Sequence, residues 1–350
     1  MKKILIQKIL ILIIVLIGFL LLFVNIGPIT GKTITQGINQ SINQESLIES
    51  FIQDQGEISV HFCPEEKCET ILIEFLETAK ESIHCALFEV ELESLQELLL
   101  KKEKVIEVKI VTDNDYLDQF DYTFVKEDSS GLMHNKFCII DGKKLTTGSM
   151  NPTFNDAYKN NNNLLLISSV MLSQNYEEEF QEMWNGVFKK GEKVRNPNIR
   201  IGKIPVKNYF CPEDDCAFHV KEELEKAEES INFMAFSFTH QGIANILLLK
   251  HLEGILVRGV AEARQVSKFS VFPQLKYQNI DIIKDANKNN MHHKVFIIDG
   301  KTLITGSMNP SSGGDTRNDE NVLIIEDKEI AQKFLGEWEK IYGEASFEKS

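Results

Sequence analysis

The sequence predicts an α/β fold made of two related halves, preceded by one transmembrane helix. Three observations predict this class. One segment occurs twice, as MHNKFCIIDGKKLTTGSMNP at residues 133–152 and as MHHKVFIIDGKTLITGSMNP at residues 291–310. Strand-like and helix-like patterns alternate around each copy, which is typical of α/β layers. An apolar run near the N-terminus has the length of a membrane-spanning helix.

The apolar run predicts a membrane anchor. Residues 9–24 are all apolar or glycine, a length that spans a bilayer as a helix. Lys2, Lys3 and Lys8 precede the run, so the positive-inside rule places the N-terminus in the cytoplasm and the rest of the chain outside. A cleaved signal peptide is the alternative, but the run is long for one and no small-residue cleavage site follows it cleanly. We expect residues 1–30 to form a cytoplasmic tip and a single pass through the cell membrane.

The composition limits what the rest of the chain does. After a polar linker expected at residues 31–57, enough of the 350 residues remain for one large or two medium domains with real cores. The chain has 52 acidic and 38 basic residues and a net charge of −14, which disfavours broad nonspecific binding to nucleic acid. A few lysines that converge on one site can still hold one phosphate.

Two halves are expected, at residues 58–195 and 196–350. Each begins with a strand end, a Cys-Pro-x-x-x-Cys loop, an amphipathic helix and an apolar strand. The copies are 148 residues apart at the cysteine loops and 158 apart at the repeated segment, which predicts a ten-residue insertion within residues 264–279. Each half then continues as strand, helix and strand and closes with a long helix, at residues 83–90, 92–102, 105–113 and 175–190, and at 231–239, 242–253, 254–264 and 327–343.

The cysteines favour a set of local bridges. Two pairs close short loops in matching places, which exocytoplasmic placement would permit as disulfides: Cys63 with Cys68, and Cys211 with Cys216. A zinc site made by these four residues is an alternative, and free thiols are another. Cys85 and Cys138 lie inside apolar strands, where we expect core residues.

The repeated segment mixes chemistry with a strand pattern. In the second copy, alternation places His292 and Lys294 on one strand face and points Asp299 the other way. We therefore expect a site made by the histidine and the lysine, with Asp299 in a structural role. The Asp-Gly-Lys turn that follows allows a hairpin.

The returning strand ends in further polar groups. Gly306 lets the backbone approach closely, and Ser307 and Asn309 add a hydroxyl and an amide. Lysine and amide donors around a histidine suit a phosphoryl group, because the donors hold its oxygens while the imidazole attacks phosphorus. The first copy has the same residues at the same spacing: His134, Lys136, Asp141, Gly148, Ser149 and Asn151.

These residues resemble the phospholipase D superfamily, whose signature is His-x-Lys, four residues, Asp, six residues, Gly-Ser and a following Asn. Both copies match it, and with the flanking elements the resemblance covers roughly His61 to Glu344. The Phe-Cys-Pro opening and the next helix look most like the small nuclease-type and cardiolipin-hydrolase-type members. The alternative, that each His-Lys pair is only a solvated strand face, does not explain why both copies keep the whole signature.

The resemblance implies two α/β/α halves packed about a pseudo-twofold axis, with His134 and His292 in one cleft. One histidine would form a phosphohistidine, while the other protonates the leaving alcohol and then activates water. It also implies that no metal or cofactor is needed, because Lys136 and Lys294 offset the charge with Asn151 and Asn309. Since one chain holds both halves, we expect it to work as a monomer.

The two copies differ just downstream of the motif. Glu320, which in the family orients a catalytic histidine, aligns with Asn162 of the first half. A carboxylate raises imidazole basicity, whereas an amide can only orient the ring. We therefore expect His292 with Glu320 to be the proton donor and acceptor, and His134 with Asn162 to be the nucleophile. A partly degenerate first half with slow turnover is the alternative.

The chemistry predicted is phosphodiester cleavage without a metal. The anchor and the acidic composition favour hydrolysis of a phospholipid headgroup ester. An endonuclease acting on DNA or RNA is the second hypothesis, and a phosphatidyltransferase using the same intermediate is a third. An inactive phosphate-binding protein would tolerate loss of one histidine, and both are present.

Overall fold

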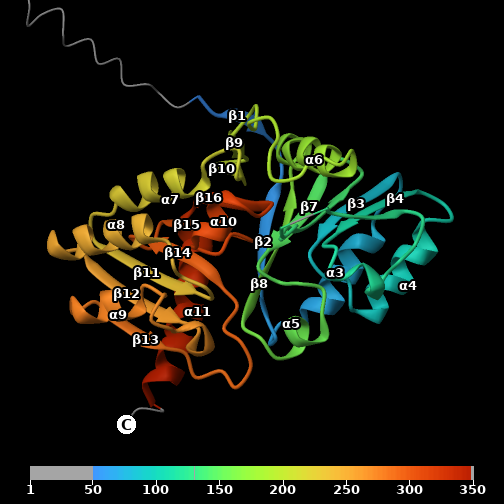
Figure 1. Ribbon diagram of the computed structural model, residues 1–350. Coiled ribbons are helices and arrows are strands. Elements are labelled where there is room, and N and C mark those ends of the chain that lie inside the picture. The colour runs from blue at the N-terminus through green and yellow to red at the C-terminus, as the bar shows by residue number, and fades with distance from the viewer. Residues whose placement is uncertain (1–49, 130, 348–350) are drawn as a thin grey trace, which may run out of the picture. The chain divides into compact units, whose positions relative to one another are not determined.

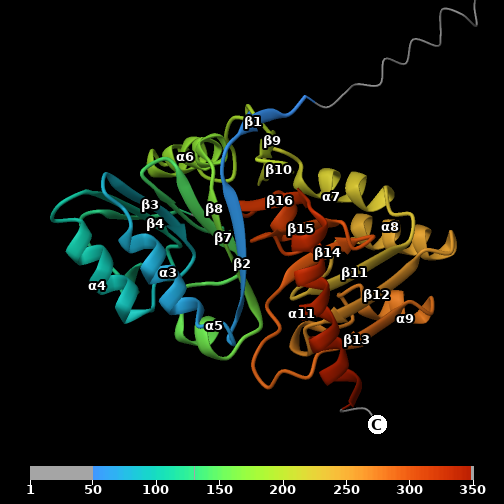
Figure 2. The same ribbon diagram turned by 180° about the vertical axis from the view of Figure 1, so that it is seen from behind.

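Two mixed β-sheets, each with helices on both faces, form the framework of the protein (Figures 1 and 2). The computed structural model describes residues 50–129 and 131–347, and those from Phe51 onward make one unit. The predicted membrane helix at residues 1–30 and most of the predicted linker lie outside the described residues. No helix in the described part of the chain has both the length and the apolar character needed to cross a bilayer.

The first half builds a seven-stranded sheet in the order β2-β8-β7-β6-β3-β4-β5. The strands β3, β4 and β5 run parallel, and the other pairs are antiparallel. The elements are β2 (Glu57–Cys63), α3 (Cys68–Glu77), β3 (Ser82–Leu87), α4 (Glu93–Lys102), β4 (Glu107–Thr112), η1 (Leu117–Gln119), β5 (Val125–Glu127), β6 (Lys136–Ile140), β7 (Lys144–Gly148), α5 (Phe154–Tyr158), β8 (Asn162–Ser168) and α6 (Val170–Trp184).

The second half repeats this order as β10-β16-β15-β14-β11-β12-β13 and adds β9 and β1 at one edge. The chain crosses between the sheets early, because β1 pairs with β9 although β2 belongs to the first half. The elements are β1 (Ile52–Asp54), β9 (Asn198–Ile201), β10 (Ile204–Cys211), α7 (Cys216–Glu225), β11 (Ser230–Ala235), α8 (Gln241–Leu252), β12 (Leu256–Ala261), η2 (Ala263–Gln265), α9 (Phe272–Tyr277), β13 (Asp281–Lys284), β14 (Lys294–Ile298), β15 (Thr302–Gly306), α10 (Ser312–Thr316), β16 (Glu320–Glu326) and α11 (Lys328–Phe347).

Burial of both sheet faces explains the continuous apolar strands. Every residue of β6 and β14 is buried. The helices α3 and α4 lie on the outer side of the first sheet, and α7 and α8 lie on the outer side of the second (Figures 1 and 2). The two long helices α6 and α11 cover the opposite faces, and α6 begins with a serine cap, Ser169, whose hydroxyl accepts from Leu172 N–H.

The two halves share one core and one polar seam. A single apolar cluster includes Phe137 and Tyr176 of the first half and Trp338 of the second. Within the seam, Asn163 Nδ2 donates to His293 Nδ1 at 3.0 Å. The matching residue Asn321 donates from Nδ2 to Asn135 Oδ1 at 2.8 Å. Matched positions thus reach across the interface in both directions, as a pseudo-twofold arrangement requires.

All six cysteines are bridged. The structure joins the short-loop pairs, Cys63 to Cys68 and Cys211 to Cys216. Cys85 and Cys138 are buried in the core as expected, but these two also form a third disulfide, which was not predicted from the sequence. They stand directly opposite each other on β3 and β6. Alternation in the sequence indicates that a residue is buried but does not identify its cross-strand neighbour.

Of the three disulfides, Cys85–Cys138 should contribute most to the free energy of unfolding. It links residues 53 apart, whereas the Cys63–Cys68 bridge links residues 5 apart. The chain-entropy model gives about 4 kcal/mol for the long loop and about 2 kcal/mol for a short one. The double variant Cys85→Ala/Cys138→Ala should therefore unfold at lower urea concentration than Cys63→Ala/Cys68→Ala. Equal midpoints at equal slope would contradict this ranking.

Candidate active site

The two motif histidines line one pocket of about 280 Å³. His134 lies two residues before the start of β6, and His292 lies at the matching place before β14. Each is held by backbone of the other half: His134 N–H donates to Asp319 O at 3.0 Å, and His292 N–H donates to Asn161 O at 2.8 Å. The site therefore exists only where the halves meet.

The side-chain partners of the histidines are exchanged relative to our prediction. His134 Nδ1 lies 2.8 Å from Glu320 Oε2, and His292 Nδ1 lies 3.0 Å from Asn162 Oδ1. The predicted pairs of His292 with Glu320 and of His134 with Asn162 were wrong. The reason is that the backbone hydrogen bonds given above join each histidine to the opposite half, at Asp319 and at Asn161. The residue that follows each of these acceptors, Glu320 or Asn162, therefore faces the histidine of the opposite half.

Both motif lysines lie beside the histidines that line the pocket. Lys136 Nζ donates to His134 O at 2.6 Å, and Lys294 Nζ donates to His292 O at 2.8 Å. Burial lowers the pKa of Lys136 to about 8 and that of Lys294 well below its usual value. Two poorly solvated ammonium groups at one site favour an anionic ligand, which would replace their lost hydration.

The two motif serines and the amide and carboxylate acceptors form a supporting layer. Ser307 Oγ donates to Glu320 Oε2 at 2.7 Å, and Ser149 Oγ lies 3.4 Å from Asn162 Oδ1. Both serines are buried. The serines thus fix the side chains of Glu320 and Asn162, which in turn orient the histidine rings.

The motif asparagines differ between the halves. Asn151 lines the pocket, and its Oδ1 is buried without a hydrogen-bond partner. Asn309 Oδ1 instead accepts from Ser237 N–H at 3.4 Å. Of these two asparagines, Asn151 is the one that lines the pocket with a free amide oxygen, whereas the amide oxygen of Asn309 is already hydrogen-bonded.

The motif glycines are required by close backbone contact. Gly148 and Gly306 have φ of 133° and 140°. A Cβ at Gly148 would lie 2.5 Å from Asn163 O, and one at Gly306 would lie 2.3 Å from Asn321 O. These contacts bring β8 and β16 close enough for the serines to reach their acceptors.

Asp141 and Asp299 lie away from the pocket. Asp141 Oδ1 accepts from Glu81 N–H at 2.7 Å and from Ser82 N–H at 3.0 Å. Asp299 Oδ1 accepts from Glu229 N–H and Ser230 N–H, both at 2.8 Å. Each aspartate thus fixes the start of the neighbouring strand, which is the structural role that the strand alternation predicts.

The paired motifs correspond to a known family. Residues 72–184 and 220–342 each match the family model described as "Cardiolipin synthase, PLD-like domain". The chain belongs to the phospholipase D superfamily. The resemblance seen in the sequence is thereby confirmed.

Relatives of this phospholipase D-like chain match one half or both. "Phospholipase D" of Rickettsia felis is 34% identical over 148 residues, which is 42% of this chain and 74% of the relative. "Mitochondrial cardiolipin hydrolase" of Canis lupus familiaris is 34% identical over 119 residues, 34% of this chain and 47% of the relative. The phosphatidylserine synthase structure from Haemophilus influenzae covers 81% of this chain and 85% of its own, with a TM-score of 0.59 and 13% identity. That structure shares the two-halved fold.

As a phospholipase D-type phosphodiesterase, the protein cleaves its substrate in two steps through a phosphohistidine. Nε2 of one histidine attacks phosphorus, a P–N bond forms, and the P–O bond to the leaving alcohol breaks while the other histidine donates a proton to that alcohol. The second histidine then takes a proton from water, the water oxygen attacks phosphorus, and the P–N bond breaks. Burial, with the nearby Lys294, lowers the pKa of His292 to about 4, and burial with Lys136 and Lys294 lowers the pKa of His134 well below its usual value. The free site therefore begins with neutral rings, and the ring that acts as acid takes up a proton from solvent when the anionic phosphate binds beside it and favours its charged form.

Several pocket residues were not predicted from the sequence. Phe88 lies edge-on to His134 with ring centres 4.9 Å apart, and Phe236 lies edge-on to His292 at 4.6 Å. Both close the predicted apolar strands at matching positions, so comparison of the two copies could have found them. Glu89, Glu91 and Asp156 also line the pocket.

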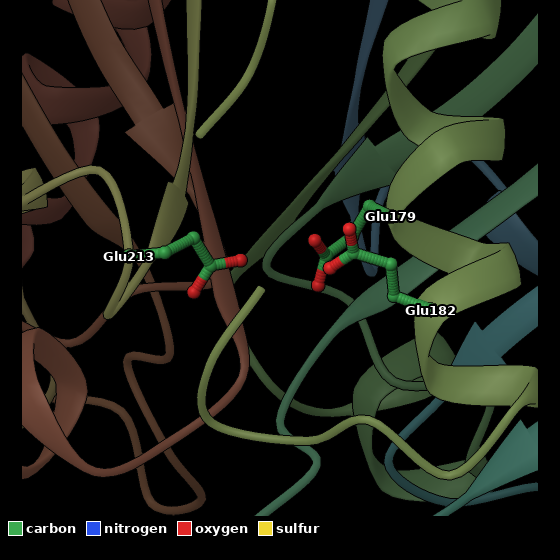
Figure 3. A group of neighbouring side chains, drawn as sticks. All are labelled: Glu179, Glu182 and Glu213. Carbon is green, nitrogen blue, oxygen red and sulfur yellow. The ribbon is translucent and has the colours of Figure 1, made fainter. Parts of the chain in front are cut away.

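A group of three carboxylates lies outside the phospholipase D pocket. The carboxylate oxygens of Glu179, Glu182 and Glu213 come within 4.8 Å of one another (Figure 3). Burial raises the pKa of Glu213 to about 7 and raises that of Glu179 well above its usual value. Protonation of Glu179 and Glu213, with a hydrogen bond shared between their carboxyl groups, explains how these two buried acidic side chains can lie close together.

Alkaline pH should weaken substrate capture. Because the pKa of Lys136 is about 8, its ammonium is charged below that pH and becomes neutral above it. The value of kcat/KM, which reports groups of the free enzyme, should therefore fall as pH rises through about 8. Lys136→Arg should shift this limb to higher pH, since guanidinium stays charged. A profile that stays flat to about pH 9.5 would show that the Lys136 charge does not limit binding.

Proposed function

We propose that the protein hydrolyses the headgroup ester of a phospholipid whose alcohol carries an amine. The observation that supports this substrate is the one-sided charge of the pocket. Glu89 and Glu91 line it from the first half, whereas the matching residues of the second half are Ser237 and Thr239. The pocket thus has carboxylates at one wall, while the two motif lysines lie beside the histidines that line it.

This charge distribution disfavours nucleic acid. A nucleic-acid strand places further phosphates on both sides of the cleaved one, and Glu89 and Glu91 would repel them. A phospholipid has a single diester, and its leaving alcohol can be cationic. Burial, then the charge of Asp156, raises the pKa of Glu89 to about 7. An ammonium group beside Glu89 would favour the ionised form.

The proposed location is the outer side of the cell membrane, with the predicted helix at residues 1–30 as a single-pass anchor and the N-terminus in the cytoplasm. The support is the apolar run in the sequence and the three disulfides, which are typical of oxidising compartments. Because one chain supplies both histidines, we propose that it acts as a monomer without a metal or cofactor.

The substrate test uses the full-length protein reconstituted in vesicles, with EDTA present. Phosphatidylethanolamine vesicles, phosphatidylglycerol vesicles and single-stranded DNA are compared. We expect release of ethanolamine to be fastest and Glu89→Gln to reduce it about tenfold, with little effect on phosphatidylglycerol. Cleavage of DNA alone would overturn the lipid proposal in favour of the endonuclease hypothesis. Loss of all activity in EDTA would overturn the metal-free mechanism.

A further inference from the structure

The two halves differ at two matched positions near the histidines. The copies align without a gap from the motif onward, so Asp156 matches Gly314 and Asn162 matches Glu320. Each half therefore has one carboxylate and one uncharged residue, in exchanged positions. The second-half carboxylate, Glu320, binds His134.

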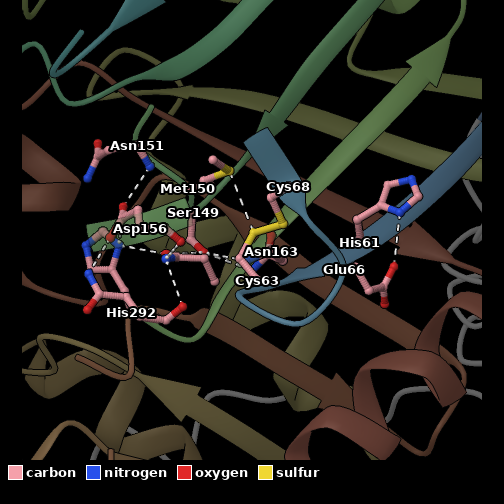
Figure 4. Close-up of a disulfide and its surroundings, with 12 residues drawn as sticks. His61, Cys63, Glu66, Cys68, Ser149, Met150, Asn151, Asp156, Asn163 and His292 are labelled. Carbon is pink, nitrogen blue, oxygen red and sulfur yellow. Dashed lines mark hydrogen bonds and ion pairs between the residues drawn. A yellow bond between two sulfur atoms is a disulfide. The ribbon is translucent and has the colours of Figure 1, made fainter. Parts of the chain in front are cut away.

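Asp156 is placed against the other histidine. It lies in the single-turn helix α5, and its Oδ2 is 3.4 Å from His292 Nδ1 (Figure 4). The same oxygen accepts from Asn151 N–H at 2.7 Å, and Oδ1 accepts from Asn160 Nδ2 at 2.5 Å. The side chain is 4% exposed, so these bonds fix its orientation.

The second half has no room for an aspartate at this position. A Cβ at Gly314 would lie 2.4 Å from Asn309 O. In the first half the matching Asn151 turns its N–H toward the Asp156 carboxylate instead. The local backbone thus decides which of the two positions in each half supplies the carboxylate.

We propose that Asp156 is the positioning residue for His292 and gives this ring the carboxylate partner that Glu320 gives to His134. The amide Asn162 orients the His292 ring but cannot balance the positive charge that the ring acquires on protonation or phosphorylation. The charged groups acting on His292 are Lys294 from β14, Lys136 from β6 and Asp156 from α5. Of these, only the carboxylate stabilises the charged ring.

The charge state of Asp156 fits this role. Burial alone would raise its pKa, but the charge of His292 and the hydrogen bonds from His292, Asn160 and Asn151 N–H outweigh burial and lower it. Asp156 therefore stays ionised across the working pH range. Thr153 caps α5 by accepting from Asp156 N–H at 3.2 Å, which is a purely structural contact of the backbone.

The test moves the first-half carboxylate from position 156 to position 162, which is where the second half has its carboxylate. Activity is measured with bis(4-nitrophenyl) phosphate, so the result does not depend on whether the natural substrate is a lipid. Asp156→Asn should lower kcat about 10- to 100-fold and change KM less than about twofold. The double variant Asp156→Gly/Asn162→Glu should recover at least about tenfold in kcat over Asp156→Asn. Asp315→Asn, which alters a carboxylate outside the pocket next to the matched Gly314, should keep wild-type kcat.

A second measurement separates positioning from folding. In protein with ¹⁵N-labelled histidine, Asp156→Asn should lower the pKa of His292 below its value of about 4, and the double variant should raise it again. Unchanged kcat and unchanged His292 pKa in Asp156→Asn, with only a loss of stability, would overturn the proposal. A double variant no more active than the single one would also overturn it.

Discussion

Replacing His292 with alanine is expected to give an enzyme that becomes phosphorylated and then stalls, whereas replacing His134 should prevent phosphorylation. The two rings have different partners. Asp156 beside His292 stays ionised, so His292 is the ring whose protonated form is favoured once the anionic substrate is bound, as an acid and base requires. Burial raises the pKa of Glu320 beside His134 to about 7, against the charge of Lys136, so this carboxylate carries less charge near neutral pH. Of the two rings, His134 is therefore better suited to remain neutral and to attack phosphorus.

Both variants should lose at least about 10³-fold in kcat, because each histidine takes part in both steps. The intermediate is detected as a mass increase of the intact protein after mixing with bis(4-nitrophenyl) phosphate and an alkaline quench. His251→Ala, in the last turn of α8, serves as a control that should remain fully active. Trapping the adduct in His134→Ala and not in His292→Ala would reverse the assignment.

The parts of the site that lie along one strand could be predicted from the sequence. Alternation placed His292 and Lys294 together and pointed Asp299 away, and the structure has Lys294 bonded to His292 O and Asp299 bonded to the backbone of Ser230. The repeat itself predicted two halves, and both sheets share one strand order from β2 to β5 and from β10 to β13. Local periodicity determines these features.

The parts that depend on the interface could not be predicted in the same way. The exchange of Glu320 and Asn162 between histidines arises from backbone bonds of Asp319 and Asn161 across the halves, which no local pattern encodes. The Cys85–Cys138 bridge depends on strand register in the same manner. Asp156 lies in a helix of five residues, too short for a periodic pattern.

The signal for Asp156 was nevertheless present in the repeat. Asn162 stands where the second half has a carboxylate, and a carboxylate stands six residues earlier where the second half has Gly314. Two compensating differences within a well-matched repeat indicate a function that was moved rather than lost. Comparison of the copies position by position would have shown the exchange, although not which histidine it serves.

Lys294→Met should make the protein more stable and much less active. Burial, with the nearby charge of Lys136, lowers the pKa of Lys294 well below its usual value, so the ammonium is less favourable in the folded chain than in the unfolded chain. An apolar side chain of similar length removes this cost, and we expect the free energy of unfolding to rise by about 1–4 kcal/mol. The negative charge on the phosphoryl oxygens grows toward the transition state, so loss of the cation should lower kcat by about 10²–10³.

Lys207, a buried lysine outside the pocket, gives the matched control for the expected gain in stability and loss of activity. Lys207 Nζ lies 2.8 Å from Glu223 Oε1, and both side chains are buried. Lys207→Met should therefore cost about 1–3 kcal/mol in urea unfolding, because Glu223 loses a buried partner and is left with the more exposed Lys226, while the activity of the folded protein stays near wild type. If Lys294→Met lost stability as Lys207→Met does, Lys294 would be holding the fold. A gain in stability with a loss in kcat is the result expected of a cation kept for the substrate phosphate.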